Sequence, residues 1–259
     1  MTRNVRLTIS YNGTPFHGWQ VQPDVNTIQG TLIKVIEKIT SGKNVNLIGA
    51  GRTDAGVHAL GQVANFKTEK TLTEKKWKAA LNGLLPPEIV VWKVEFVPDG
   101  FHSRYTAIDK TYAYHIGFQK SPFLFDREWT FSRPLKLPAM KKALSFLAGK
   151  HDFTSFASSL SESETKICHL KKYEIVQNRH SLIFRLTANR FLTHMVRNIV
   201  GTLVEVGLGK IKPAEIKQIL ELKDRKKAGP TAPPHGLYLV EVKYRKRLSE
   251  GLASPPPLA

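Results

Sequence analysis

The order of polar and apolar segments in the first hundred residues is the feature that most narrows the folds open to this chain. Residues 5–13, VRLTISYNG, alternate in polarity and end in a turn, as expected of a strand. Residues 26–40 predict an amphipathic helix, and Asn26 with Gln29 gives it a capping-box-like start. The next expected elements are strands VNLIGAG and HALGQVANFKT, helix TEKKWKAALNGLL closed by Pro86 and Pro87, and strand EIVVWKVEFV. This β-α-β-β-α-β order predicts a ferredoxin-like, split βαβ unit.

The remainder of the chain repeats that order loosely. Its expected elements are strands KTYAYHIGF and EWTFSRPL, helix PAMKKALSFLAG stopped by Gly149, hairpin KKYEIVQN–SLIFRLTAN, a long helix from about Phe191, a short helix at 213–222 and strand GLYLVEVKY. Strands mixed with helices in each half predict an α+β fold with mainly antiparallel sheet. We therefore expect an N-terminal lobe over residues 1–100, a C-terminal lobe over 101–247 and a fraying basic, proline-rich tail over 248–259.

The balance of charge indicates a polyanionic partner. Lys and Arg number 39 against 21 Asp and Glu, a formal net charge of +18. Such an excess favours nucleic acid through long-range attraction and counterion release, although an acidic membrane surface or plain solubility would also fit. The single Cys168 excludes an intrachain disulfide framework. Because no apolar run approaches the roughly 20 residues of a membrane span, and no leader is recognisable, we expect a soluble, cytoplasmic protein without membrane association.

The stretch AGRTDAGVHA, residues 50–59, sets Asp54 among small residues. In an extended segment Arg52 and Asp54 point to the same face, and the neighbouring glycines allow a ligand to approach the backbone closely. Three roles are open to Asp54: satisfying turn amides, binding a metal with His58, or attacking a substrate. Local physics favours the turn residue. The metal role lacks further ligands at diagnostic spacing, since there is no HExxH motif and only one cysteine.

Two other stretches combine cations with an ordered pattern. Residues 189–209 carry a clear apolar helical stripe with Arg197 at its edge, where it either snorkels to solvent or reaches inward to a buried carboxylate. Residues 101–114, FHSRYTAIDKTYAY, interleave aromatic and basic side chains, as expected either of an RNA-stacking surface or of an ordinary edge strand. The basic clusters KDRKK (223–227) and KYRKR (243–247) are weaker signals and predict solvated surface.

Taken together, these motifs resemble the tRNA pseudouridine synthase A family. The matching blocks, in chain order, are FHGWQVQPDVNTIQG, GRTDAGVHA, FHSRYTAIDKTYAY, HMVRNIVGTLVEVG and GLYLVEV. The resemblance runs from about residue 3 to residue 245, nearly the whole chain, and five specific blocks in order are not a chance match. It implies two ferredoxin-like lobes whose sheets join, with a cleft between them, in agreement with the element order above.

The resemblance also implies roles for individual residues. Asp54 matches the family's nucleophile and Arg197 the arginine that pairs with that carboxylate, so the turn-cap role recedes. Arg52 matches the residue that helps displace the target base, and Tyr112 matches the tyrosine that stacks on the uracil. The remaining implied tRNA contacts are Phe101, His102, Ser103, Arg104 and Tyr105, and less securely Lys120 and the loop LSESE with Ser161 and Ser163. That loop carries Glu162 and Glu164 where some relatives are basic or amide-rich.

The implied activity is isomerisation of uridine to pseudouridine in the anticodon stem-loop of tRNA, at positions 38, 39 and 40. Substrate and product are isomers, so neither a cofactor nor a metal is expected. A carboxylate is a competent covalent nucleophile, and the target base must leave the stack to reach it. Family members act as homodimers on tRNA, which implies the same partners here. The alternatives are a basic tRNA-binding protein without catalysis and a metal-dependent phosphoester hydrolase that uses Asp54 and His58.

Overall fold

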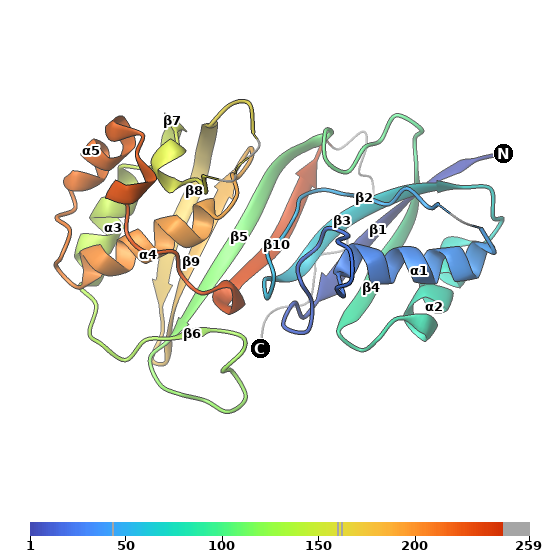
Figure 1. The fold of residues 1–259 in the computed structure, drawn as a ribbon, viewed down its shortest axis with the longest axis horizontal. Coiled ribbons are helices and arrows are strands. Elements are labelled where there is room, and N and C mark those ends of the chain that lie inside the picture. Colours follow the sequence, from blue (N-terminus) through green and yellow to red (C-terminus); the bar gives the residue numbers. More distant parts are fainter. Residues whose placement is uncertain (43, 160, 162, 246–259) are drawn as a thin grey trace. The chain divides into compact units, whose positions relative to one another are not determined.

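A computed structural model describes residues 1–42, 44–159, 161 and 163–245 (Figure 1). The chain divides into two compact units. The first comprises Met1–Ile108 together with the chain from Tyr238 onward, and the second comprises Asp109–Leu237. Helices and mainly antiparallel strands occur in both units, which confirms the α+β class expected from the sequence.

The first unit has the split βαβ order that the sequence predicts. Its strands are β1 (Arg3–Tyr11), β2 (Ile48–Gly49), β3 (His58–Thr68), β4 (Ile89–Val97) and β10 (Leu237–Tyr244), and its helices are α1 (Ile28–Thr40) and α2 (Glu74–Leu84). The order β4-β1-β3 is antiparallel, with Leu7 opposite both Ala64 and Val94. At the other edge of β3, β2 pairs antiparallel with it and β10 pairs parallel to it.

Helices α1 and α2 lie side by side and supply the apolar layer of this unit (Figure 1). The amphipathic helix expected from the sequence is confirmed, because Ile28, Leu32 and Ile36 on one of its faces are fully buried. Trp77 of α2 is also buried and meets Phe66 of β3 edge-on at 5.4 Å between ring centroids. The helix start differs from the sequence expectation. Thr27 caps α1 by accepting the Gly30 amide, since its extended backbone places the hydroxyl over the first turn.

The second unit is a mainly antiparallel sheet in the order β5-β9-β8-β7, with the short strand β6 paired parallel to β5, and a helical layer. Its elements are β5 (Ala107–Gly117), β6 (Trp129–Thr130), α3 (Leu137–Ser145), β7 (Gly149–Asp152), β8 (Ile167–Gln177), β9 (Ser181–Ala188), α4 (Met195–Gly207), α5 (Glu215–Leu222) and 3-10 turns Thr154–Phe156, Arg225–Lys227 and Pro234–Gly236. The expected hairpin is confirmed as β8–β9. Helices α3 and α4 pack together, and their core includes Met140, Phe184 and Leu203.

Two boundaries depart from the sequence expectations. The long helix α4 begins at Met195 and not near Phe191, because His194 adopts a left-handed backbone with φ 61° that interrupts the turn before it. The division between units falls at Ile108 and Asp109, eight residues past the boundary placed by sequence, and the last strand returns to the first unit. That return rests on pairing of Leu239 with Ala59, a non-local contact with no local sequence signal.

None of the helices within the described ranges is both long and apolar enough to cross a membrane. The basic, proline-rich tail that the sequence marks at 248–259 lies outside the described residues.

Two helical glycines should respond oppositely to alanine. A Cβ at Gly201 in α4 would lie 1.7 Å from the Pro230 carbonyl oxygen, whereas a Cβ at the exposed Gly83 in α2 would meet nothing within 4 Å. We expect Gly201→Ala to lower the free energy of unfolding by about 1–3 kcal/mol through overpacking. Gly83→Ala should raise it by about 0.5–1 kcal/mol through helix propensity. Urea denaturation of both variants measures the contrast, and equal shifts would contradict it.

Candidate active site

Asp54 lies on the loop that joins β2 to β3 in the first unit. Its side chain is half-buried, that of Arg52 is exposed, and that of Thr53 between them is 7% exposed. Thr53 is thus the buried residue of the three, between the exposed Arg52 and the half-buried Asp54. Thr53 is therefore the residue through which this loop is attached.

Three hydrogen bonds attach this loop to the rest of the first unit. The Tyr11 hydroxyl lies 2.8 Å from Thr53 Oγ1, and the Trp19 amide donates to the Thr53 carbonyl at 3.0 Å. Gln62 on β3 donates to the Gly51 carbonyl at 2.9 Å. Tyr11 and Trp19 are both buried, so these bonds are shielded from water and hold the chain at Gly51 and Thr53, next to Asp54.

The segment 16–20 can approach the loop only because residue 18 is glycine. Gly18 has φ +85°, and a Cβ there would lie 2.7 Å from the Thr53 carbonyl oxygen. The same carbonyl accepts the Trp19 amide. Part of the block FHGWQVQPDVNTIQG is thus packed against the loop that carries Asp54, and Trp19 itself is buried.

His58, the first residue of β3, supports the loop from its other end. Its Nδ1 accepts the Gly13 amide at 3.1 Å, and its ring stacks on Tyr238 with 4.7 Å between centroids. The Nδ1 lone pair is therefore engaged in the hydrogen bond from Gly13, and His58 is only 2% exposed. Across the described part of the chain, no group of three His, Cys, Asp or Glu side chains is placed to hold a metal ion.

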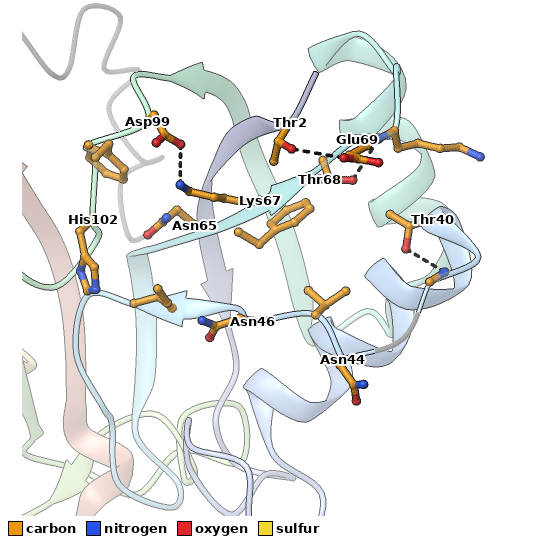
Figure 2. A pocket seen from close by; sticks show the side chains of 17 residues that line it. Thr2, Thr40, Asn44, Asn46, Asn65, Lys67, Thr68, Glu69, Asp99 and His102 are labelled. Atoms are coloured by element: carbon orange, nitrogen blue, oxygen red, sulfur yellow. Dashed lines mark hydrogen bonds and ion pairs between the residues drawn. The ribbon is translucent and has the colours of Figure 1, made fainter.

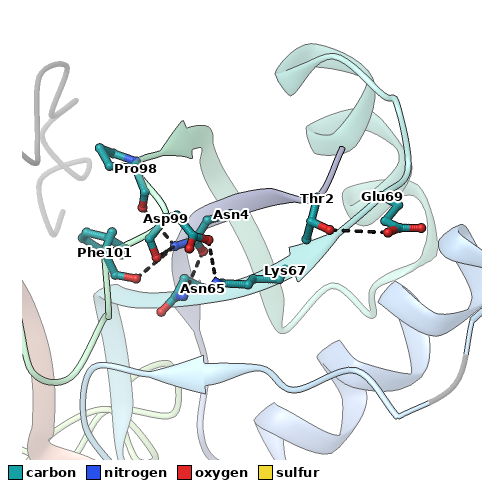
Figure 3. Close-up of polar contacts among 8 residues, drawn as sticks. All are labelled: Thr2, Asn4, Asn65, Lys67, Glu69, Pro98, Asp99 and Phe101. Carbon is teal, nitrogen blue, oxygen red and sulfur yellow. Dashed lines mark hydrogen bonds and ion pairs between the residues drawn. The ribbon is translucent and has the colours of Figure 1, made fainter.

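Segment 101–105 is tied down by a buried polar network on the first unit (Figure 3). Asn4 donates to the Phe101 carbonyl at 2.9 Å, and Asn65 donates to Asn4 Oδ1 at 3.0 Å. The Ser103 amide and hydroxyl both donate to Asn65 Oδ1, at 2.9 and 2.6 Å. Phe101 and Ser103, which the sequence assigns to RNA contact, are buried and serve here as anchors of the segment.

The other three residues of this segment form a stack in which Arg104 and Tyr105 are exposed and His102 is half-buried. The His102 and Tyr105 rings lie 4.3 Å apart between centroids, and the Arg104 guanidinium lies 5.6 Å from the Tyr105 centroid. The Tyr105 side chain is 75% exposed. His102 Nδ1 accepts the amides of Arg104 and Tyr105, which fixes the turn beneath the stack. An exposed aromatic face with an adjoining cation suits a nucleotide base and its phosphate.

A hollow of about 970 Å³ opens beside this segment on the first unit (Figure 2). His102, Asn65 and Asp99 lie at one end of it, and Thr40 and Asn44 lie at the other. Its lysines, Lys67 and Lys70, are balanced by Asp99 and Glu69, and Lys67 pairs with Asp99 at 2.5 Å. Asp54 does not line it. The hollow is therefore not the place where Asp54 would act as a nucleophile.

In the second unit, Arg197 sits in the first turn of α4. Its Nε donates to the Ala232 carbonyl at 2.8 Å, and the Ala232 amide donates back to the Arg197 carbonyl at 3.1 Å. Tyr114 of β5 lies nearby and donates to the Pro233 carbonyl at 2.8 Å. Burial raises the pKa of Tyr114, and the positive charge of Arg197 opposes that rise in part. Arg197 is thus half-buried, and its guanidinium is bonded to a main-chain carbonyl of its own unit.

The remaining predicted contacts of the second unit differ in exposure. Tyr112 is 8% exposed and meets Phe191 edge-on at 5.0 Å, whereas Lys120 is exposed. In the acidic loop, the Ser161 carbonyl accepts Lys166 Nζ, and Ser163 Oγ accepts an Arg190 guanidinium N–H at 2.9 Å. Glu162 lies outside the described residues.

The supporting residues were not identified from the sequence. Tyr11, Gln62 and Asn65 occupy strand positions without a distinguishing local pattern, and Arg225 lies in the cluster KDRKK, for which solvated surface was predicted. That prediction is wrong for Arg225, which is half-buried and bonded to Asn198 and Thr231. One signal was available for the loop support, namely the polar Thr53 between the two charged residues of an extended segment.

Comparison with known proteins gives a consistent result. The family model described as tRNA pseudouridine synthase matches residues 7–106 and 143–245. A tRNA pseudouridine synthase A of Thermoanaerobacter sp. strain X514 is 49% identical over 244 residues, covering 93% of this chain and all of the relative. Proteins of the same name from Anoxybacillus flavithermus and Bacillus subtilis are 45% and 42% identical, each over 93% of this chain and 99% and 98% of the relative.

The fold and these matches define the class of protein as an RNA-modifying isomerase. More particularly, the chain belongs to the tRNA pseudouridine synthase family, whose reaction converts uridine to pseudouridine in tRNA. The matched residues include the loop of Asp54 and the turn of Arg197, whereas Tyr112 and Lys120 fall between the two matched ranges.

The burial of the Tyr11 phenol should make the stability of the protein sensitive to alkaline pH. Burial raises the pKa of Tyr11 to about 12, although its hydrogen bonds to Thr53 and Gln62 oppose the rise. The neutral phenol is therefore favoured in the folded state. Its contribution, roughly 2–3 kcal/mol, is fully present below pH 10 and is lost as pH rises through about 12.

Urea denaturation of the wild type and of Tyr11→Phe between pH 8 and pH 12 measures this effect. We expect the wild type to lose more stability than the variant across the range, because phenylalanine does not titrate. Tyr114 and Tyr244, whose pKa values burial also raises, titrate in both proteins and cancel in the difference. Parallel curves for the two proteins would contradict the assignment.

Proposed function

We propose that this chain forms pseudouridine in the anticodon stem-loop of tRNA, at positions 38, 39 and 40, with Asp54 as the covalent nucleophile. The observation that carries the proposal is the attachment of the Asp54 loop. Thr53 is anchored on the side of the core by Tyr11 and Trp19, while Asp54 beside it is half-buried. A nucleophile held on a backbone that cannot shift is pre-organised for attack.

The chemistry balances without a further reagent. The C1′–N1 bond of uridine breaks, a C1′–C5 bond forms, the hydrogen on C5 leaves as a proton, and N1 gains a proton. Asp54 forms a transient bond either to the sugar carbon or to an activated ring carbon, and that bond breaks when the product forms. The uracil must leave the helical stack for this attack, at a cost of a few kcal/mol.

We assign the supporting roles as follows. Arg52, exposed beside Asp54, occupies the space that the displaced base vacates. Tyr112 stacks on the uracil, and Arg197 pairs with the Asp54 carboxylate in the working enzyme. His102, Arg104 and Tyr105 contact the tRNA through their partly exposed stack, whereas the buried Phe101 and Ser103 position that stack. Lys120, Ser161 and Ser163 complete the tRNA contacts that we propose.

We further propose that the enzyme works as a homodimer in the cytoplasm, where its tRNA substrate is present, without a cofactor. The alternative that the chain merely binds tRNA predicts no pseudouridine at all. Incubation of the purified protein with an unmodified tRNA transcript labelled with tritium at uracil C5 separates the two, because bond formation at C5 releases the label to water. Chemical mapping of pseudouridine in the same tRNA identifies the modified positions.

Replacing the nucleophile should abolish the reaction and spare binding. We expect Asp54→Asn to lower the rate by on the order of 10⁴-fold or more, because the amide is a poor nucleophile. The tRNA dissociation constant should stay within about twofold, since the substitution changes one group among many contacts. Asp99→Asn, an exposed carboxylate beside the hollow, is the matched control and should react at the wild-type rate. Wild-type activity in Asp54→Asn would refute the assignment.

The excess of 18 positive charges should make tRNA binding strongly salt-dependent. Four or more phosphate contacts predict a fall in affinity of at least about 100-fold between 50 and 200 mM salt. Arg104→Met should reduce the slope of log K against log salt by about one, because it removes one proposed phosphate contact. Filter binding across the salt range measures both slopes. A flat response in the wild type would count against an electrostatic interface.

A further inference from the structure

A strap formed by residues 225–232 crosses helix α4 in the second unit and holds Arg197 directly. As described above, the strap residue Ala232 bonds Arg197 twice, once through the side-chain Nε and once through the main-chain carbonyl. The orientation of the guanidinium therefore depends on where the strap places the Ala232 carbonyl.

The strap is fastened to α4 next to Arg197 by a closed set of polar contacts. Thr231 donates its hydroxyl to Asn198 Oδ1 at 2.7 Å. One guanidinium nitrogen of Arg225 lies 3.0 Å from both Asn198 Oδ1 and Thr231 Oγ1. Asn198 is fully buried, and its Nδ2 donates to the Phe156 carbonyl at 2.8 Å. Two of the side chains that fasten the strap are thus direct neighbours of the bonded pair, because Asn198 follows Arg197 and Thr231 precedes Ala232.

Close packing removes the freedom of the strap to slide along the helix. Gly201 and Gly229 have no room for a side chain, because a Cβ on either would lie within 3 Å of backbone atoms across the contact. The Gly229 amide donates to Thr202 Oγ1 at 2.9 Å, and Thr202 in turn donates to the Asn198 carbonyl at 2.7 Å. The strap backbone therefore lies directly on the helix backbone over one turn beyond Arg197.

The position of Arg225 carries a desolvation cost. It is half-buried, and burial lowers its pKa. Among the residues that the structure describes, its partners are the uncharged oxygens of Asn198, Thr231 and Ala228, with no carboxylate within ion-pair distance. A cation desolvated against neutral acceptors adds little stability, whereas its forked donors fix geometry. This residue choice favours a positioning role over a purely stabilising one.

We infer that Thr231, Asn198 and Arg225 are positioning residues for pseudouridine formation, which act by setting the orientation of Arg197 through the strap. The inference rests on the proposed role of Arg197 beside the catalytic carboxylate. None of the three needs to touch the tRNA. Their loss should therefore slow the chemical step, since a small displacement of a catalytic group costs up to about 100-fold in rate, and should leave tRNA affinity unchanged.

The sharpest test is the pair Thr231→Val and Thr231→Ser, measured as single-turnover pseudouridine formation with full-length enzyme in excess over tRNA. Valine keeps the shape and loses the hydroxyl, whereas serine keeps the hydroxyl. We expect the valine variant to be at least about tenfold slower and the serine variant to stay within about twofold of the wild type. Both should bind tRNA with the wild-type dissociation constant. A valine variant that is fully folded by thermal melting and reacts at the wild-type rate would overturn the inference.

Arg225→Met provides a second, independent arm, and Arg197→Met separates this inference from the function on which it rests. We expect Arg225→Met to be slow alone and to add no further loss in the double variant with Arg197→Met, because both act through one guanidinium. Additive losses would overturn the inference. If Arg197→Met is slow while Thr231→Val and Arg225→Met react at the wild-type rate, the positioning role of the strap is refuted and the proposed function stands. Wild-type activity in Arg197→Met would refute the proposed role of Arg197 itself.

Discussion

The contact between Thr53 and the core is the interaction on which the proposed chemistry of this protein depends. A carboxylate nucleophile needs an environment open enough for a nucleotide and a backbone rigid enough to aim the attack. The small residues around Asp54 provide the room. The Tyr11 hydroxyl, the Trp19 amide and Gln62 provide the rigidity, and they act on the backbone and on Thr53 while leaving the carboxylate outside the core. Rigidity is thus supplied by residues outside the loop, and access by the small residues within it.

The same division recurs at the other parts of the proposed site. In segment 101–105, Phe101 and Ser103 are anchored by Asn4 and Asn65, and the stack of His102, Arg104 and Tyr105 remains outside. In the second unit, Ala232 holds the Nε and main chain of Arg197, in a strap that is itself fastened by Arg225. Asp54, the stack of segment 101–105 and Arg197 each stand next to a residue that is bonded into its unit. Buried polar networks suit this task, since fully satisfied ones define a single geometry.

The net positive charge of the chain acts over a longer range than these contacts. The net excess of 18 positive charges acts over distances comparable with the screening length and favours encounter with a polyanion. It does not mark the site, because individual cations serve different ends. Lys67 neutralises Asp99 beside the hollow, Arg104 stacks on an exposed tyrosine, and Arg225 is turned inward. Composition therefore indicates the class of partner, and only placement indicates which cations can meet it.

The sequence by itself determined the α+β class, the β-α-β-β-α-β order of the first unit and the family. These follow from local periodicity, as with Ile28, Leu32 and Ile36 on one face of α1, and from motifs short enough to be continuous. Only the tertiary structure decided that β10 pairs with β3, that Thr27 and not Asn26 caps α1, and that Arg225 is half-buried. The physical reason is that a contact between distant segments leaves no periodic trace in the sequence. For the cap, Asn26 and Thr27 are both residue types that favour this position, and the backbone of Thr27 decides between them. Thr231 lies 33 residues from Asn198, and nothing near either residue indicates that the two will meet.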